Sequence, residues 1–300
     1  MRERLRAEDQ AAGLRRRLRD LRKTRGGPGR ARPPVVAVAS GKGGVGKTVL
    51  SVALSLALRE AEKRVLLLDL DPGLADADIL LGVHPERTLE ECAAQGLPLG
   101  EALLEGPGGL LLLPGGSGME ELAEPGGFER IGLWKALEEM GPGMDALVFD
   151  TGAGISGPAL APLRRADLVL LVTTPQPAAL ADAYALYKIL HREGLSGRVR
   201  LVVNRAGSSG EALLTATRIR KVSDRFLGVT PEFLGWIPES PLVAESARRR
   251  RPFLLERPDC GPSRAVRALA ARVLEVLSAR GEAEKERPVP PEREKAGPAR

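Results

Sequence analysis

The fold is decided by VVAVASGKGGVGKT at residues 35–48, where an apolar run precedes a glycine-rich loop and a helical pattern. Glycines let backbone N–H groups turn towards phosphate oxygens, and the start of the helix adds a partial positive charge. In this frame, Lys47 is expected to hold the β- and γ-phosphates and Thr48 to coordinate Mg²⁺. The residues expected to surround the nucleotide here are Gly41, Gly43, Gly44, Val45, Gly46, Lys47, Thr48 and Val49.

Further apolar runs follow along the chain, at 65–70, 110–113, 146–149, 168–173 and 199–203. They do not alternate between apolar and polar residues, which indicates strands buried on both faces of a parallel sheet. Helical patterns lie at 47–62, 128–140, 177–193, 210–226 and 263–279. This alternation predicts an α/β fold, with a doubly wound, mostly parallel sheet, helices on both faces and the ligand at the carboxyl ends of the strands.

The net charge of +6 is distributed unevenly. Residues 1–32 contain 12 Lys/Arg and 4 Asp/Glu, and residues 281–300 contain 5 of each, which leaves 28 and 30 for residues 33–280. We predict a mobile basic helix and linker at 1–32, an ATPase domain at 33–280 and a disordered tail at 281–300. Because the domain is nearly neutral, we do not expect it to bind nucleic acid.

Composition excludes several other classes of protein. No run approaches 18 apolar residues, and the first 30 residues are too rich in arginine for a signal peptide, so we expect a cytoplasmic chain. Cys92 and Cys260 form no CxxC pair. We therefore expect buried or unreactive thiols, and an iron–sulfur carrier with the same loop is the less favoured alternative.

Lys42 gives the loop the form KGGxGKT, a deviant Walker A signature, and the chain thereby resembles the MinD/ParA superfamily of ATPases. The resemblance implies that Lys42 reaches across an ATP-dependent homodimer to the partner's phosphates. It also implies that Asp71 positions the attacking water, that Asp69 lies near Mg²⁺, and that Asp150 holds Mg²⁺ through water. A turn residue at the end of a strand is the alternative for Asp69.

The implied catalytic residues are thus Lys42, Lys47 and Asp71, and the implied metal residues are Thr48, Asp69 and Asp150. Asn204 resembles the superfamily's adenine-reading asparagine, and Pro238 lies in a segment that resembles the one flanking the base; turn residues are the alternative for both. The implied cofactors are ATP and Mg²⁺. With no obvious strong general base, we expect slow turnover, as in a switch.

Within the superfamily, the chain resembles the FlhG (FleN) family of flagellar number regulators in several further segments. The similar segments are 73–75, 78–82, 103–109, 113–118, 150–156, 174–177 and 182–185. The stretch DQAAGLR at residues 9–15 also fits that family's DQAxxLR motif. Two departures are Pro72, where the family usually has Leu, and Asp76, where it usually has Asn.

In the FlhG family, the DQAxxLR helix docks on the signal-recognition-particle-type GTPase FlhF and stimulates its GTP hydrolysis. The implied partner-binding residues are Asp9, Gln10, Ala11, Leu14 and Arg15. A solvated basic helix without a partner is the alternative for this segment.

Two further alternatives concern function and location. The function could instead be that of a MinD-like regulator of cell division or a ParA-like partition ATPase. The apolar stripe of 263–279 could lie on lipid at the inner face of the membrane, but we favour the last helix of the fold, packed against the sheet.

Overall fold

The computed structural model describes residues 32–71, 76–116, 124, 126–140 and 143–285. Within this part of the chain, one sheet has the strand order β3-β4-β2-β5-β1-β6-β7-β8. Its strands are β1 (Val35–Ala39), β2 (Val65–Leu70), β3 (Leu104–Glu105), β4 (Leu111–Leu113), β5 (Ala146–Thr151), β6 (Leu168–Thr173), β7 (Val199–Ala206) and β8 (Glu232–Pro238). All neighbouring strands are parallel except β3 and β4.

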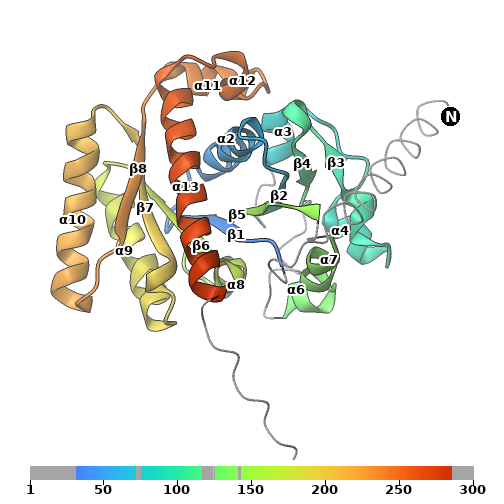
Figure 1. Ribbon diagram of the computed structural model, residues 1–300, viewed down its shortest axis with the longest axis horizontal. Coiled ribbons are helices and arrows are strands. Elements are labelled where there is room, and N and C mark those ends of the chain that lie inside the picture. Colours follow the sequence, from blue (N-terminus) through green and yellow to red (C-terminus); the bar gives the residue numbers. More distant parts are fainter. Residues whose placement is uncertain (1–31, 72–75, 117–123, 125, 141–142, 286–300) are drawn as a thin grey trace, which may run out of the picture.

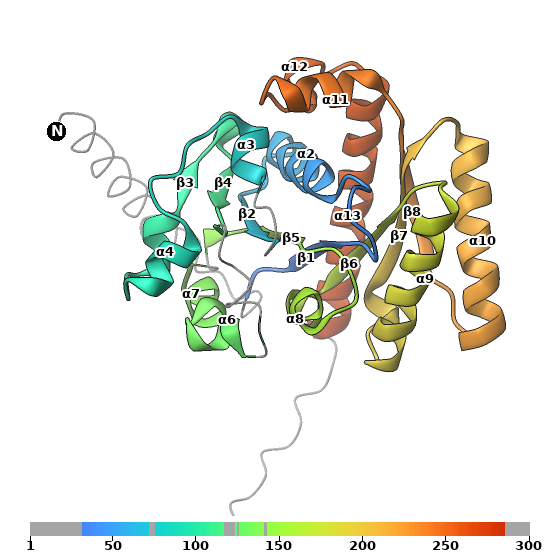
Figure 2. The same ribbon diagram turned by 180° about the vertical axis from the view of Figure 1, so that it is seen from behind.

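Helices cover both faces of this sheet, and β1 and β5 lie between α2 on one side and α7 and α8 on the other (Figures 1 and 2). The helices are α2 (Lys47–Glu60), α3 (Ala77–Leu81), α4 (Leu89–Ala94), α6 (Gly127–Arg130), α7 (Leu133–Met140), α8 (Gly157–Arg165), α9 (Pro177–Arg192), α10 (Ser209–Leu227), α11 (Pro241–Arg248), α12 (Phe253–Glu256) and α13 (Gly261–Lys285). The predicted doubly wound α/β fold is confirmed.

The strands are uniformly apolar because each has two faces to bury. Along β1, Val35, Ala37 and Ala39 enter the apolar layer beneath α7, α8 and α9, whereas Val36 and Val38 enter the layer beneath α2 and α13. The same strand pairs with β5 on one side and with β6 on the other. The loop that follows β1 therefore lies at the middle of the sheet's carboxyl edge, where doubly wound folds bind ligands.

The structure contains several elements that the sequence patterns did not indicate. The expected helix at 128–140 is two helices, α6 and α7, because Gly132 between them has a φ of 70°, which does not fit a continuous helix. The edge strand β8 contains Gly235 and ends at Pro238, so its sequence resembles a loop. The short elements β3, α3, α4, α8, α11 and α12 were also not expected.

The last helix, α13, belongs to the core, as the favoured interpretation of 263–279 predicted. Its apolar stripe is buried against α2 and β8 and consists of Val266, Leu269, Ala270, Val273 and Leu277. The helix continues to Lys285, past the predicted domain end at residue 280. Among the described residues, no helix combines the length and apolar character needed to cross a membrane.

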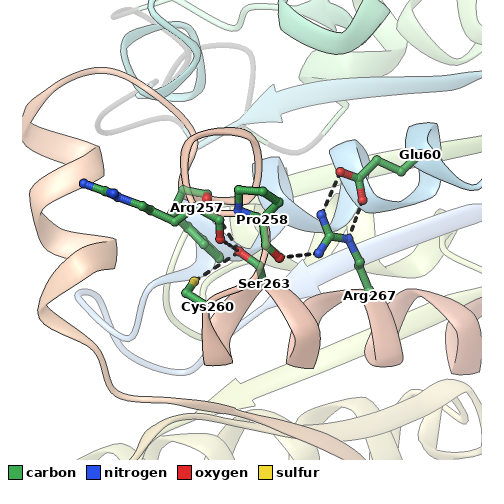
Figure 3. Close-up of polar contacts among 7 residues, drawn as sticks. Glu60, Arg257, Pro258, Cys260, Ser263 and Arg267 are labelled. Atoms are coloured by element: carbon green, nitrogen blue, oxygen red, sulfur yellow. Dashed lines mark hydrogen bonds and ion pairs between the residues drawn. The ribbon is translucent and has the colours of Figure 1, made fainter.

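Polar contacts join the start of α13 to α2 and to the turn that precedes it (Figure 3). The guanidinium of Arg267 donates to both carboxylate oxygens of Glu60, at 2.6 and 3.0 Å, and also to the carbonyl of Pro258. The hydroxyl of Ser263 donates to the carbonyl of Arg257 at 2.8 Å and lies 3.2 Å from the sulfur of Cys260. These contacts stabilise the turn between α12 and α13. They thereby support α12, which packs against α2.

Candidate functional site

The glycine-rich loop between β1 and α2 passes close to two other elements. A Cβ atom on Gly41 would lie 2.0 Å from the carbonyl oxygen of Asp182 in α9, and one on Gly46 would lie 2.5 Å from Nδ2 of Asn204. Gly44 and Gly46 also have φ angles of 79° and 91°, in the left-handed region that favours glycine. These positions in the loop therefore require glycine. Because glycine has no side chain, the backbone N–H groups of the loop stay accessible to phosphate.

The two lysines of the loop lie in different environments. Lys47, the first residue of α2, is 6% exposed, and its ammonium is close enough to Asp150 to stabilise that carboxylate. Lys42 is exposed on the loop. Thr48 is half-buried, and its hydroxyl lies near enough to the Asp150 carboxylate to lower the pKa of that group. The structure thus brings Lys47, Thr48 and Asp150 together and leaves Lys42 at the surface.

Two carboxylates lie side by side at the ends of neighbouring strands. Asp69 of β2 is in register with Asp150 of β5, and the residues are 1% and 0% exposed. The Asp69 carboxylate accepts from the backbone N–H groups of Asp71 at 3.2 Å and Ala77 at 3.0 Å. Burial, and then the charge of Asp150, raise the pKa of Asp69 well above its usual range. A cation between them would offset this cost.

The two oxygens of the Asp150 carboxylate differ in their hydrogen bonding. Its Oδ1 accepts from the hydroxyl of Ser51 at 2.9 Å. Its Oδ2 is buried and has no hydrogen-bond partner among the described residues. Burial raises the pKa of Asp150 to about 6, although the hydroxyls of Thr48 and Ser51 and the charge of Lys47 lower it.

An unpaired buried carboxylate oxygen beside a threonine hydroxyl fits a hard cation with oxygen ligands, such as Mg²⁺. Within the described ranges, no group of three or more His, Cys, Asp or Glu side chains could hold a metal by itself. Mg²⁺ in such a site keeps several waters and takes ligands from nucleotide phosphates. The residues present therefore fit a metal ion that arrives with a nucleotide.

A pocket of ≈ 470 Å³ adjoins the loop at Gly46 and is suited to a base. Its walls come from α2, β7, β8, α11, the start of α12 and α13, and they include Asn204 and Pro238 as well as Val49. The remaining apolar contacts are Leu50, Ile237, Pro241, Val243, Ala244, Ala247, Phe253 and Val266. An apolar pocket with few polar groups is the usual form of a small-molecule site.

Asn204 is held in place by backbone groups on both sides of its amide. Its Nδ2 donates to the carbonyl of Val45 at 2.7 Å, and its Oδ1 accepts from the N–H of Arg205 at 3.0 Å. An asparagine amide has two N–H donors and two acceptor lone pairs, so one donor and one acceptor are left over. That pair matches the donor and acceptor of an adenine edge.

Asp71, directly after β2, and the loop after β5 lie near the phosphate site. Asp71 is half-buried directly after β2, whereas residues 72–75 lie outside the described part of the chain. After β5, the N–H of Gly154 donates to the carbonyl of Ser40 at 2.9 Å. Burial, and then the charges of Asp71 and Asp78, raise the pKa of Asp76, the residue that departs from the expected asparagine.

Some residues of interest lie elsewhere or were not anticipated. Asp9, Gln10, Ala11, Leu14 and Arg15 lie outside the described residues. Cys92 and Cys260 belong to apolar layers on opposite faces of the sheet, so they do not form a common metal site. Ser51 and Phe253 were missed. Ser51 could have been found from its spacing of one helical turn after Thr48, whereas nothing local marks Phe253 as part of a pocket.

Comparison with known proteins identifies the family. The CobQ/CobB/MinD/ParA nucleotide binding domain matches residues 36–253. Antiactivator FleN of Pseudomonas aeruginosa is 39% identical over 239 residues, which cover 80% of this chain and 85% of that protein. Flagellum site-determining protein YlxH of Helicobacter pylori is 34% identical over 217 residues, covering 72% of this chain and 73% of that protein.

Solved structures show the same architecture. The MinD cell division protein of Aquifex aeolicus is 27% identical, with a TM-score of 0.61, over 81% of this chain and 97% of that one. MinD of Pyrococcus horikoshii, solved with Mg-ADP, has a TM-score of 0.68 at 24% identity, over 83% of this chain and 98% of that one. The chain therefore belongs to the CobQ/CobB/MinD/ParA family of nucleotide-binding domains and, within it, to the FlhG (FleN) group of MinD/ParA-type ATPases.

Proposed function

We propose that this ATPase is a dimeric molecular switch that regulates the number or placement of flagella and stimulates an FlhF-type GTPase. The observation that carries the proposal is the similarity of the chain to Antiactivator FleN, over 80% of its length, and to a flagellum site-determining protein, over 72%. As a member of its family, the chain uses ATP with Mg²⁺. The buried carboxylate pair and the adjoining pocket are compatible with both.

Each residue of the site has a proposed role that follows from its position. Lys47 holds the β- and γ-phosphates, and Thr48 ligates Mg²⁺, while Asp150 accepts from a water in its shell. Asp71 orients the attacking water. The chemistry is mainly positioning and charge stabilisation, because phosphoryl transfer requires little covalent participation from the protein.

The remaining proposed roles are contact with the second subunit, binding of the adenine base and support of the metal ion. Lys42 is exposed, as a group that reaches a partner subunit's phosphates must be. Asn204, which lies next to Gly46, and Pro238 hold the adenine in the pocket. We place Asp69 beside the metal, where its charge favours a cation. Positive charge from two subunits around one nucleotide would couple ATP binding to dimerisation.

We further propose that residues 1–32 form a separate arm, that the ATPase domain extends from residue 33 past the predicted end at 280 to the end of α13 at Lys285, and that the residues after it form a tail. In this division, Asp9, Gln10, Ala11, Leu14 and Arg15 contact the GTPase, and Gln10 supplies the polar group that acts in its site. A basic segment of low apolar content that orders on binding can cover a large surface with modest affinity.

The deciding experiment measures GTP hydrolysis by the cognate FlhF-type protein with the full-length chain, with Gln10→Ala, and with a chain lacking residues 1–31. Wild type should accelerate turnover, whereas Gln10→Ala and the truncated chain should not. Arg19→Ala, in the same arm but outside the motif, is the matched control and should retain stimulation. Stimulation that survives the loss of Gln10, or no stimulation of an active GTPase, would reject this role.

A MinD-like regulator of cell division is the second candidate, since septum site-determining MinD proteins are among the relatives, at 28% and 31% identity. This candidate would bind a division partner in the ATP state and would ignore the flagellar GTPase. A ParA-type role would require ATP-dependent DNA binding that weakens steeply with salt. Lipid association is testable in the same way, by sedimentation with anionic vesicles in ATP and in ADP.

A further inference from the structure

We propose that Ser51 is a positioning residue for the metal site: its hydroxyl orients the Asp150 carboxylate so that Oδ2 faces the water shell of Mg²⁺. This inference rests on the proposed function, because it presumes that Asp150 serves a metal ion. It adds a residue outside the glycine-rich loop, one helical turn after Thr48 on α2.

The contact is short, direct and fully enclosed. Ser51 and Asp150 are both 0% exposed, and the Ser51 hydroxyl donates to Oδ1 at 2.9 Å. Terminal carboxylate torsions are broad, so a carboxylate without such a partner can rotate over a wide range. Thr48 lies nearby, but the hydrogen bond to a defined oxygen of this carboxylate comes from Ser51. With Ser51 on Oδ1, the unpartnered oxygen is Oδ2.

A purely structural role for Ser51 is the competing explanation. Its hydroxyl also lies 3.0 Å from the carbonyl of Lys47, the usual partner for a serine inside a helix. A hydroxyl has one proton, so the two acceptors compete for it. An ionised carboxylate is the stronger acceptor, and the hydrogen bond to Asp150 is therefore favoured whenever Asp150 is charged.

The same helix offers a matched control. Ser55, one turn further along α2, is also 0% exposed, and its hydroxyl donates to the carbonyl of Ser51 at 2.7 Å. It therefore has the helix-serine contact of Ser51 without the contact to a carboxylate. Substituting each serine by alanine separates the loss of a buried helix hydroxyl from the loss of the bond to Asp150.

The test follows the binding of a fluorescent ATP analogue to the full-length protein while Mg²⁺ is titrated, with a parallel measurement in EDTA. Ser51→Ala should raise the Mg²⁺ concentration for half-saturation about 10- to 100-fold, the usual effect of losing a partner that holds a metal-site group. Binding in EDTA should be unchanged. Ser55→Ala should behave as wild type in both measurements, and Ser51→Thr, which keeps the hydroxyl, should restore the Mg²⁺ response.

Equal half-saturation for Ser51→Ala and Ser55→Ala would overturn the proposal, as would an equal loss of binding with and without Mg²⁺. Should Ser51→Ala fail to fold, Ser51→Cys keeps the side-chain volume and replaces the hydroxyl by a weak donor. An unchanged Mg²⁺ response in that variant would be equally decisive. If wild type itself shows no Mg²⁺ dependence, the proposed metal site fails instead, which distinguishes the two failures.

Discussion

At Gly41, the backbone of the phosphate loop approaches α9 so closely that no side chain fits. A Cβ atom there would lie 2.0 Å from the backbone oxygen of Asp182, and neither backbone can move far within packed elements. We expect Gly41→Ala to lower the free energy of unfolding by about 1–3 kcal/mol, the usual cost of overpacking. Urea unfolding of the nucleotide-free protein, followed by circular dichroism, measures this loss.

The control for this prediction lies two residues away in the same loop. Gly43 is exposed, and a Cβ atom on it would have no neighbour within 4 Å. Gly43→Ala should therefore change the free energy of unfolding by no more than about 0.5 kcal/mol, as for other surface substitutions. Similar losses in the two variants would mean that the close approach to α9 is not what requires glycine at position 41.

Asp150 makes the stability of the nucleotide-free protein depend on pH. Burial raises the pKa of Asp150 to about 6, above the value of about 3.9 expected in the unfolded chain. Between these values the folded state holds a proton that the unfolded state has released, so stability falls as pH rises. The contribution lost between pH 4 and 6 is on the order of 3 kcal/mol.

Asp150→Asn removes this titration and tests the origin of the effect. The variant should show a flatter dependence of unfolding free energy on pH over this window, and above pH 6 it should be more stable than wild type without nucleotide. Burial raises the pKa of Asp69 as well, and this part of the slope is common to wild type and variant, whereas the part of the Asp69 shift that comes from the charge of Asp150 is lost in the variant. Parallel slopes in the two proteins would contradict the assignment to Asp150.

At the scale of elements, the apolar stripe of α13 is buried in the core of the domain. Leu269 is 2% exposed in the layer between α13, α2 and β8, whereas Leu255 of α12 is 39% exposed. We expect Leu269→Ala to lower the free energy of unfolding by about 2–5 kcal/mol, because it removes buried methyl groups and leaves a cavity. Leu255→Ala is the matched control, and it should cost far less.

Thermal and urea unfolding of the two leucine variants would measure the difference. A large loss for Leu269 means that α13 cannot leave the core to enter a lipid interface without unfolding part of the domain. A small loss of unfolding free energy would indicate that the helix is loosely attached. It would then support the alternative that the apolar stripe of α13 lies on lipid. The ion pair of Arg267 with Glu60 is partly exposed and contributes little to this attachment.

At the scale of the whole molecule, the carboxyl edge of the sheet carries exposed side chains that the proposed dimer would use. Lys42 is exposed on the phosphate loop, and Ile155, in the adjacent loop after β5, is 48% exposed. We expect Asp71→Ala to accumulate as a dimer in ATP with Mg²⁺, because nucleotide binds but the attacking water is no longer oriented. Sedimentation velocity in ATP and in ADP measures the two states.

The companion variant tests the contribution of the exposed lysine. Lys42→Ala, alone or combined with Asp71→Ala, should stay monomeric in ATP, because the charge that reaches the second nucleotide is missing. Both proteins should be monomers in ADP, which controls for non-specific association. An Asp71→Ala protein that binds ATP with Mg²⁺ and remains monomeric would exclude the dimeric switch.

Local patterns were sufficient for much of this protein. Strands buried on both faces need apolar side chains at every position, so the central strands are visible in the sequence. The phosphate loop is equally easy to recognise, because its glycines, Lys47 and Thr48 lie within one short stretch of sequence. Elements interrupted by Gly or Pro, such as β8 and the α6–α7 pair, could not be found in this way, since their packing overrides their local preference.

The sequence by itself determined the class of fold, the phosphate loop and the family. Only the tertiary structure decided which distant residues meet: Asp69 beside Asp150, Asn204 against Val45, and Phe253 in the pocket beside Gly46. It also decided that the stripe of α13 faces the core, because one amphipathic pattern suits either protein or lipid. Periodicity records that a face is apolar, whereas what covers that face depends on the packing of the whole chain.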